Sequence, residues 1–430
     1  MNQPAEHPLR HRLFNESHTR PYAEIGVPVQ VSYMVLLTGE ISSNKESDHL
    51  GVLADRYGVT PPLESATHYT ANFGQFSVKW ERHTEFSSYT FFAEKDCHEP
   101  FSSPVINEIP DEWLGGLEGE LLVAQHIEIT ACEVEDFDHN RLLTFFREES
   151  LVGSYVGGTA ARAWTDFRLQ KDGFSRLLVL DDSLTRQQTS RLVQHLLEME
   201  TYRMLALLGF PLVEKYGRKI TEMGQDLTNL TRQMMVAGTL EEERTLLEKL
   251  TALEADIEMV ITATSYRFGA TGAYEAIVVD RVRRLREHRI EGAQMLSRYL
   301  ERRFQPAMNA CESVSTRLEN LSSRVARASQ ILMARVDLAL ESQNRDLLHS
   351  MDRRAHLQLR LQETVEGLSI AAISYYIVGL VGYIVKALKA AGLPLNSDLV
   401  VGASIPFVLA GVWLGVRRVK KKLIRNQDSE

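Results

Sequence analysis

Two long apolar segments near the C-terminus constrain this chain more than any other feature. Residues Leu368–Val385 and Leu399–Val416 carry no charged side chain. As helices, each would rise ~27 Å, close to the ~30 Å hydrocarbon thickness of a bilayer. Because backbone groups in lipid must be hydrogen-bonded internally, we expect a two-helix transmembrane hairpin over residues 367–418. A buried helical hairpin in a soluble core is the alternative, although uncharged runs of this length are uncommon there.

Basic residues around these segments predict their orientation. Arginines in 353–360 precede the first segment, and a run of lysines and arginines in 417–425 follows the second. The link Lys386–Asp398 holds only two lysines. Since basic residues favour the cytoplasmic side, both termini are predicted to be cytoplasmic, with residues 419–430 as a basic tail.

Charge and cysteine usage limit the classes of partner. The 430 residues carry a net charge of −9, and the basic residues are spread along the chain, so no nucleic-acid partner is predicted. The N-terminus lacks the apolar region of a signal peptide. Cys97, Cys132 and Cys311 show no CxxC spacing, which favours free thiols in a reducing cytoplasm.

Residues 1–187 are predicted to form a mixed α/β cytoplasmic domain. Apolar runs rich in β-branched and aromatic residues alternate there with Pro- and Gly-containing loops. The predicted strands are Val29–Leu37, Phe76–Phe92, Glu120–Ile129, Ala163–Leu169 and Phe174–Leu180. Lys171-Asp172-Gly173 separates the last two and is typical of a hairpin turn.

Residues 188–366 are predicted to be helical. Leucines at three- and four-residue spacing between Leu192 and Leu208 indicate a helix that ends at Gly209. A capping box at Thr239–Glu242 starts another helix, and a further helical run covers Tyr274–Tyr299.

The longest predicted helix begins at Pro306 and meets no further proline or glycine before Gly367. At about 60 residues it would be ~90 Å long and would run into the first apolar segment. Its apolar residues step by four and three, a heptad pattern typical of a coiled-coil seam. The seam residues are Val314, Leu318, Leu321, Val325, Ala328 and Leu332. This seam is consistent with pairing with helices of the same chain. It is equally consistent with a coiled coil between chains.

The predicted strand Phe76–Phe92 carries the sharpest polar pattern. Alternation places Lys79, Glu81, His83 and Glu85 on one face. Because carboxylate and imidazole are common metal ligands, Glu81, His83 and Glu85 form a candidate divalent-metal site. The alternative is a solvated sheet face with cross-strand ion pairs.

A second polar cluster lies at the N-terminus. Its members are His7, Arg10, His11, Glu16, His18 and Arg20. Pro8 and Pro21 make the segment irregular, so an arm that docks on its own α/β domain is favoured over a phosphate or metal site.

Small residues occur in both apolar segments. Gly379 and Gly382 lie in the first, and Gly411 and Gly415 form a GxxxG step in the second. These glycines are predicted to allow close helix packing, within the hairpin or between two copies. Neither segment holds Asp, Glu or His, which argues against an ion relay.

Several segments are similar to one family. His7–Pro21 (HPLRHRLFNESHTRP), Trp80–Phe86 (WERHTEF), Leu196–Leu208 (LLEMETYRMLALL) and Arg267–Tyr274 (RFGATGAY) carry the similarity. They resemble motifs of the domain-of-unknown-function family 3422, uncharacterised bacterial membrane-anchored proteins. The resemblance covers essentially the whole chain. It implies a protein of the bacterial inner (plasma) membrane and brings no assigned activity.

The predicted architecture also resembles CorA-type magnesium channels, which combine an α/β cytoplasmic domain, a long helix, two spans and a basic tail. That resemblance implies a homo-oligomeric divalent-cation channel. In those channels the first span ends in a Gly-Met-Asn motif, and this chain has none. Its link instead holds Lys386 and Lys389, whereas a cation entrance favours acidic or carbonyl oxygens.

The sequence thus predicts an α+β cytoplasmic domain, a helical stalk with a coiled-coil segment and a C-terminal transmembrane hairpin in a multi-pass inner-membrane protein. Phosphate-loop, dinucleotide, HExxH and nucleophile-elbow motifs are absent, so neither catalysis nor a cofactor is expected. We expect a scaffold that acts through protein–protein association, as a homo-oligomer. A CorA-like channel is the alternative, and a metal-dependent hydrolase using Glu81, His83 and Glu85 is the third hypothesis.

Overall fold

The computed structural model describes residues 7, 9–10, 25–39, 43–64, 66–95, 99–131, 137–390 and 396–427. Internal contacts divide the chain into two compact units. The first unit consists of residues 1–237 and 245–330, and the second of residues 238–244 and 331–430. The boundary predicted after residue 187 therefore lies inside the first unit.

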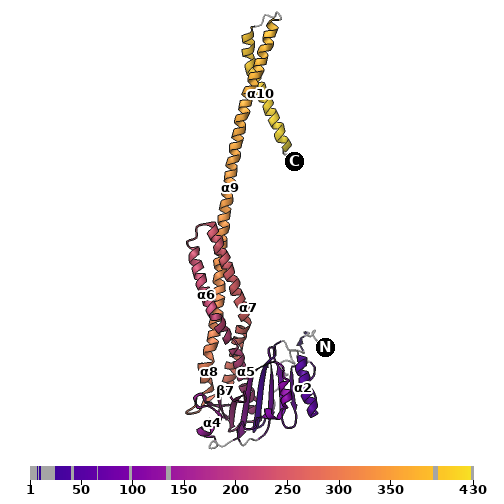
Figure 1. Ribbon diagram of the computed structural model, residues 1–430, viewed down its shortest axis with the longest axis vertical. Helices are drawn as coiled ribbons and strands as arrows, with labels where there is room; N and C mark the ends of the chain where they lie inside the picture. The colour runs from indigo at the N-terminus through magenta and orange to yellow at the C-terminus, as the bar shows by residue number, and fades with distance from the viewer. Residues whose placement is uncertain are drawn as a thin grey trace, which may run out of the picture. The chain divides into compact units, whose positions relative to one another are not determined.

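The first unit is built on a nine-stranded sheet with the order β2-β3-β4-β1-β5-β8-β7-β6-β9. Its strands are β1 (Val29–Leu37), β2 (His68–Asn72), β3 (Ser77–Arg82), β4 (Phe86–Ala93), β5 (Glu120–Ala131), β6 (Val152–Val156), β7 (Ala161–Leu169), β8 (Ser175–Asp181) and β9 (His288–Arg289). Strands β5 and β8 pair in parallel. The other neighbouring pairs are antiparallel. Figure 1 shows the sheet in the indigo and magenta part of the chain.

Helices surround the sheet and continue beyond it. They are α2 (Ser43–Tyr57), η1 (Val105–Glu108), α3 (Asp111–Gly115), α4 (His139–Phe145), η3 (Glu148–Ser150), α5 (Arg186–Leu207), α6 (Phe210–Met234), α7 (Leu240–Arg284), α8 (Leu296–Arg303), α9 (Gln305–Ala390) and α10 (Ser397–Gln427). The predicted combination of a large sheet with long helices in a mixed α+β protein is confirmed.

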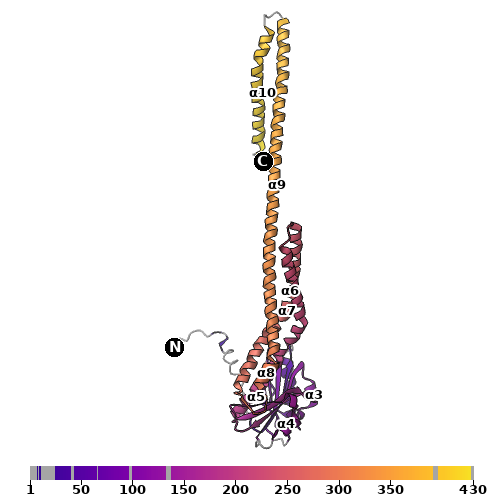
Figure 2. The ribbon, with the colours of Figure 1, turned by 90° about the vertical axis from the view of Figure 1, so that its left-hand side faces the viewer.

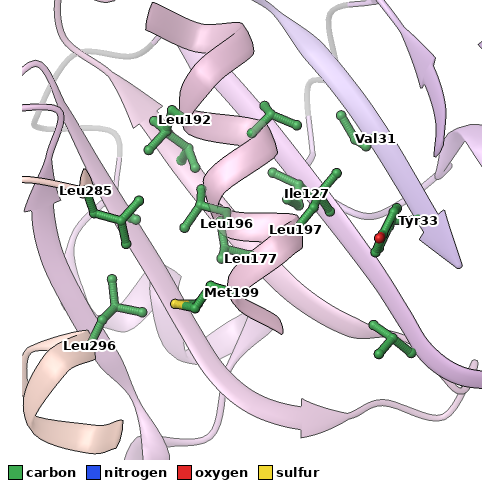
Figure 3. Packing of buried hydrophobic residues seen from close by; sticks show 14 of the residues in the cluster. Val31, Tyr33, Ile127, Leu177, Leu192, Leu196, Leu197, Met199, Leu285 and Leu296 are labelled. Carbon is green, nitrogen blue, oxygen red and sulfur yellow. The ribbon is translucent and has the colours of Figure 1, made fainter. Parts of the chain in front are cut away.

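Helix α5 covers one face of the sheet. It begins at a capping box in which the Thr185 side chain accepts a hydrogen bond from the Gln188 amide, and Gln188 accepts one from the Thr185 amide. The side of α5 that carries Leu196 then packs on Val31 and Ile127 of the central strands (Figure 3). Leu196 is fully buried, and truncating such a leucine to alanine costs about 2–5 kcal/mol of stability.

The opposite face is covered in two places. Helix α2 buries Leu50 and Leu53, and α3 buries Trp113, in a cluster with Trp80 and Phe91 of the sheet. Helix α4 belongs to a separate cluster further along the sheet. Figure 2 shows α5 and α8 on one side of the sheet and α3 and α4 on the other. Burial on both faces explains why β1 is almost wholly apolar, and its predicted bounds are confirmed.

Helices α6, α7 and α9 run beyond the sheet. The heptad seam residues of α9, from Val314 to Leu332, are all buried in the single chain. Arg317 of α9 donates a 2.8 Å hydrogen bond to Thr221 of α6, and Lys219 of α6 pairs with Asp256 of α7 at 3.2 Å. Pairing within the chain therefore accounts for the burial of this seam.

A close helix contact lies where α5 ends. A Cβ atom on Gly209 would overlap the Thr271 hydroxyl oxygen and would lie 3.4 Å from the Cys311 sulfur. The Thr271 hydroxyl donates a 3.1 Å hydrogen bond to the carbonyl oxygen of Ala206, one of the last carbonyls of α5. α7 approaches residue 209 too closely for a side chain there unless Thr271 shifts.

The second unit contains the end of α9 and helix α10. Both helices are long and apolar enough to cross a membrane by length and composition. Tyr375, Tyr383 and Phe407 are 78%, 75% and 80% exposed. Figure 2 shows α10 beside the last part of α9. A Cβ atom on Gly382 would lie 3.8 Å from a methyl carbon of Val401, so the two helices approach each other there.

The predicted strand Phe76–Phe92 is wrong in extent because it contains a hairpin. β3 ends at Arg82 and β4 begins at Phe86, and the His83 amide donates a 2.8 Å hydrogen bond to the Phe86 carbonyl. The turn holds no glycine or proline. The sequence signal for a turn is therefore missing.

The helix predicted over Tyr274–Tyr299 is also wrong in extent. Helix α7 ends at Arg284, and Arg286 takes a positive φ of 48°. Residues His288–Arg289 then pair with β6 at the edge of the sheet. Gly367, in contrast, does not interrupt α9.

Candidate functional site

The predicted metal site starts on β3, where Glu81 lies beside Lys79. The Lys79 ammonium is 2.9 Å from a Glu81 carboxylate oxygen, and the two side chains are 8% and 10% exposed. Lys79 also donates to the Gln194 side chain of α5 at 3.3 Å. This pair is buried between the sheet and α5, so this part of β3 is not a solvated face.

His83 and Glu85 lie in the turn after β3, away from its regular alternation. The His83 ring stacks on Phe86 with centroids 4.2 Å apart. Glu85 pairs with Arg267 of α7 at 2.9 Å. In the part of the chain that the structure describes, no three His, Cys, Asp or Glu side chains come together as a metal site. Metal binding by Glu81, His83 and Glu85 stays a prediction, and the three side chains have different partners here.

Glu85 is the centre of a polar junction between the sheet and α7. Its carboxylate accepts hydrogen bonds from Arg267 and from the Tyr274 hydroxyl, at 11% side-chain exposure. Burial, with the Glu85 carboxylate next in effect, raises the pKa of Tyr274, so this phenol stays protonated and donates. The Tyr274 ring lies 5.4 Å from that of Tyr202 on α5. The junction therefore links the β3–β4 turn, α5 and α7.

A second buried polar group lies where β1, β5 and β8 meet. The Ser32 hydroxyl and the His126 Nδ1 are 2.9 Å apart, and Glu128 accepts a 2.7 Å hydrogen bond from the Phe101 amide. Burial raises the pKa of Glu128 to about 7 and lowers that of His126 to about 4. Ser32, His126 and Glu128 are 0%, 1% and 4% exposed, so a substrate cannot reach them and a structural role follows.

A basic cleft lies on the first unit, between α5 and the end of α7. It has a volume of about 1060 Å³. Arg186 and Arg191 line it from the first turns of α5, and Arg284 and Arg286 line it from the end of α7. None of the residues that line it is acidic. Four arginines lining one cavity favour an anionic ligand.

His195, whose side chain is less basic than that of arginine, lines the same cleft. Burial lowers the pKa of His195, Arg281 and Arg284 act in the same direction, and Glu198 opposes them. The His195 Nδ1 atom is buried and has no hydrogen-bond partner in the described structure. Because the Nδ1 atom is buried, only the rest of the ring can contact a ligand in the cleft.

The cleft was missed in the sequence because its two sides are far apart in the chain. One signal was present: Arg281, Arg283, Arg284 and Arg286 form a dense basic group around the end of a helix. Basic residues at the end of a helix are commonly just solvated. They indicate a binding site here only together with the arginines of α5 that line the same cleft.

The predicted packing glycines have different surroundings. A Cβ atom on Gly379, Gly411 or Gly415 would meet nothing within 4 Å, whereas one on Gly382 would contact Val401. Their role in packing stays a prediction. Of the N-terminal cluster, His7 and Arg10 are described, with the Arg10 amide donating to the His7 carbonyl at 2.9 Å. His11, Glu16, His18 and Arg20 lie outside the described residues.

The family model described as "Protein of unknown function (DUF3422)" matches residues 5–423. The chain belongs to this family. No curated protein matches it. In this DUF3422 protein, three of the segments that carried the resemblance meet at the Glu85 junction: Glu85 and Phe86 come from the first, Tyr202 from the second, and Arg267 and Tyr274 from the third. The resemblance to CorA-type channels stays a prediction.

Proposed function

We propose that this DUF3422 protein is a membrane-anchored scaffold in which the ends of α9 and α10 form a transmembrane hairpin. The observation that carries the proposal is the exposure of the two apolar segments. Leu368 is 76% exposed and Phe407 80% exposed, whereas a helical hairpin of a soluble core would bury such side chains. Exposed apolar helices of this length match the hydrocarbon region of a bilayer.

Flanking side chains support an orientation with both termini in the cytoplasm. The guanidinium of Arg417 lies 4.9 Å above the ring of Trp413, at the end of the second apolar segment. Tryptophan and arginine are typical of the membrane–water interface, and basic residues favour the cytoplasmic side. The first unit would then lie in the cytoplasm at the inner membrane of a bacterium.

Residues 341–360 of α9 support association with further copies. All their side chains are exposed, whereas most of the stability of helices in proteins comes from packing an apolar face against another element. Leu347 and Met351, followed by Leu361 and Val365, occupy positions of one heptad frame and are 59–70% exposed. A parallel coiled coil between copies anchored in the same membrane would bury this face.

Membrane fractionation tests the anchor. The full chain is expected in the membrane pellet after alkaline carbonate washing and to be released only by detergent, because two spans bury apolar surface in lipid. A chain ending at Glu366 is expected in the soluble fraction. A C-terminal fluorescent fusion, which becomes fluorescent only in the cytoplasm, reports the orientation. Extraction of the full chain by carbonate alone would refute the anchor.

The mass of the detergent-solubilised full chain tests the association. A discrete multimer is expected, and replacing Leu347 and Met351 by glutamate is expected to shift it towards the monomer. As a control, the exposed Leu63, which lies outside α9, is replaced by glutamate. A monomer at all protein concentrations would contradict both the scaffold and a CorA-like pore.

A further inference from the structure

We propose that the basic cleft between α5 and the end of α7 binds a small molecule that carries several phosphate groups. Arg186 and Arg191 face it from α5, and Arg284 and Arg286 from the end of α7. The volume of about 1060 Å³ exceeds what one phosphate would fill and reaches the upper range of small-molecule sites.

The charges of the cleft are only partly neutralised by the protein. Arg186 pairs with Glu94 at 3.0 Å and stays 64% exposed, and Arg284 pairs with Asp280 at 2.7 Å and stays 57% exposed. Arg191 is exposed and forms no ion pair with a described residue. Since a guanidinium has five N–H donors, a single carboxylate leaves most of them available to a ligand.

The backbone helps to fix one of these arginines. Arg286 takes its positive φ of 48° directly after α7, and its Nη2 donates a 3.2 Å hydrogen bond to the Gly157 carbonyl. This contact ties the guanidinium to Gly157, which also lines the cleft. An arginine held in this way loses little side-chain entropy when an anion binds.

The lining favours a phosphate ester over a bare inorganic ion. Leu184 lines the cleft beside its arginines, and Leu192 and Leu285 lie at its base, largely buried in the core. Guanidinium groups bind phosphate oxygens in pairs, and apolar walls accommodate an organic portion. Both a soluble nucleotide and the head group of a phosphorylated lipid share this chemistry.

Isothermal titration of the full chain in a neutral detergent tests the proposal, with ATP, tripolyphosphate and a soluble inositol-phosphate head group as probes. At low ionic strength at least one probe is expected to bind. Arg191→Gln is expected to lower the affinity for that probe about tenfold. Tighter binding of ATP identifies a soluble ligand, and tighter binding of the head group a lipid. Both outcomes support the proposal.

Arg218→Gln is the matched control, because Arg218 is an exposed arginine of α6 that pairs with Glu222 at 2.9 Å outside the cleft. It is expected to leave the affinity unchanged within about twofold. An unchanged melting temperature of Arg191→Gln shows that the fold is intact. Absence of binding by all three probes, or equal weakening by the two variants, would overturn the proposal.

Discussion

At the scale of single residues, Gly209 shows how one missing side chain sets the distance between helices. Gly209→Ala is expected to lower the free energy of unfolding by about 1–3 kcal/mol, because the added methyl group would overlap the Thr271 hydroxyl. Chemical unfolding in detergent measures this change. Gly217→Ala on α6 is the control: its Cβ would meet nothing within 4 Å, so it is expected to stabilise by about 0.5–1 kcal/mol. Equal effects of the two variants would contradict the close contact.

Glu128 and His126 make opposite contributions to the pH dependence of stability. Burial raises the pKa of Glu128 from 4.5 to about 7, so its contribution to stability is complete below pH 4.5 and is lost as the pH rises through 7. Burial lowers the pKa of His126 from 6.5 to about 4, so its contribution is present above pH 6.5 and is lost as the pH falls through 4. Between pH 4.5 and 6.5 the two effects largely cancel.

Glu128→Gln removes one side of this balance. The difference in free energy of unfolding between the wild type and the variant is expected to fall by about 3 kcal/mol as the pH rises from 4.5 to 7. This value follows from the shift of about 2.5 units in the pKa of Glu128. The variant alone should become more stable as the pH rises from 4 to 6.5. Urea unfolding at a series of pH values measures both curves. A difference that does not change with pH would exclude a raised pKa of Glu128.

At the scale of elements, Glu85 connects the β3–β4 turn to α7. In a double-mutant cycle, Glu85→Gln and Arg267→Gln are expected to show a coupling energy of about 1–2 kcal/mol, because the pair is largely shielded from water. The exposed pair Arg218–Glu222 is expected to couple by about 0.3–0.5 kcal/mol. Coupling energies of the same size would mean that the junction does not fasten α7 to the sheet.

Elements with strong local signals could be predicted from the sequence. β1 is buried on both faces and is mostly apolar, with Gln30 and Ser32 as its polar exceptions. The capping box at Thr239 and Glu242 forms as expected. The turn at His83–Glu85 could not be predicted because its residues have no turn preference. The break after Arg284 follows from the pairing of β9 with β6, which is a long-range contact.

The candidate site was harder to predict than the fold. A pattern of alternation placed Glu81, His83 and Glu85 on one face, and the turn after Arg82 separates their environments. The basic cleft, in contrast, depends on α5 meeting the end of α7. Arginines that are brought together by the fold from distant parts of the chain show no pattern in the local spacing of residues.

At the scale of the whole molecule, α5 belongs to the core of the sheet. Its Leu196 and Met199 are fully buried in the cluster that includes Val31 and Ile127. A division after residue 187 would therefore expose one face of the sheet to water, although the composition of the chain changes there. The two units of the structure divide at residues 237/238 and 244/245 and within α9 at 330/331.

The contact at Gly209 also has a consequence for the history of the family. A side chain at this position can be accommodated only if the residue opposite it, Thr271, becomes smaller or α7 moves away. Replacement of Thr271 alone removes the hydrogen bond to the Ala206 carbonyl and leaves space that only a larger residue at 209 would fill. Across related chains the two positions should therefore change together, although they are far apart in the sequence.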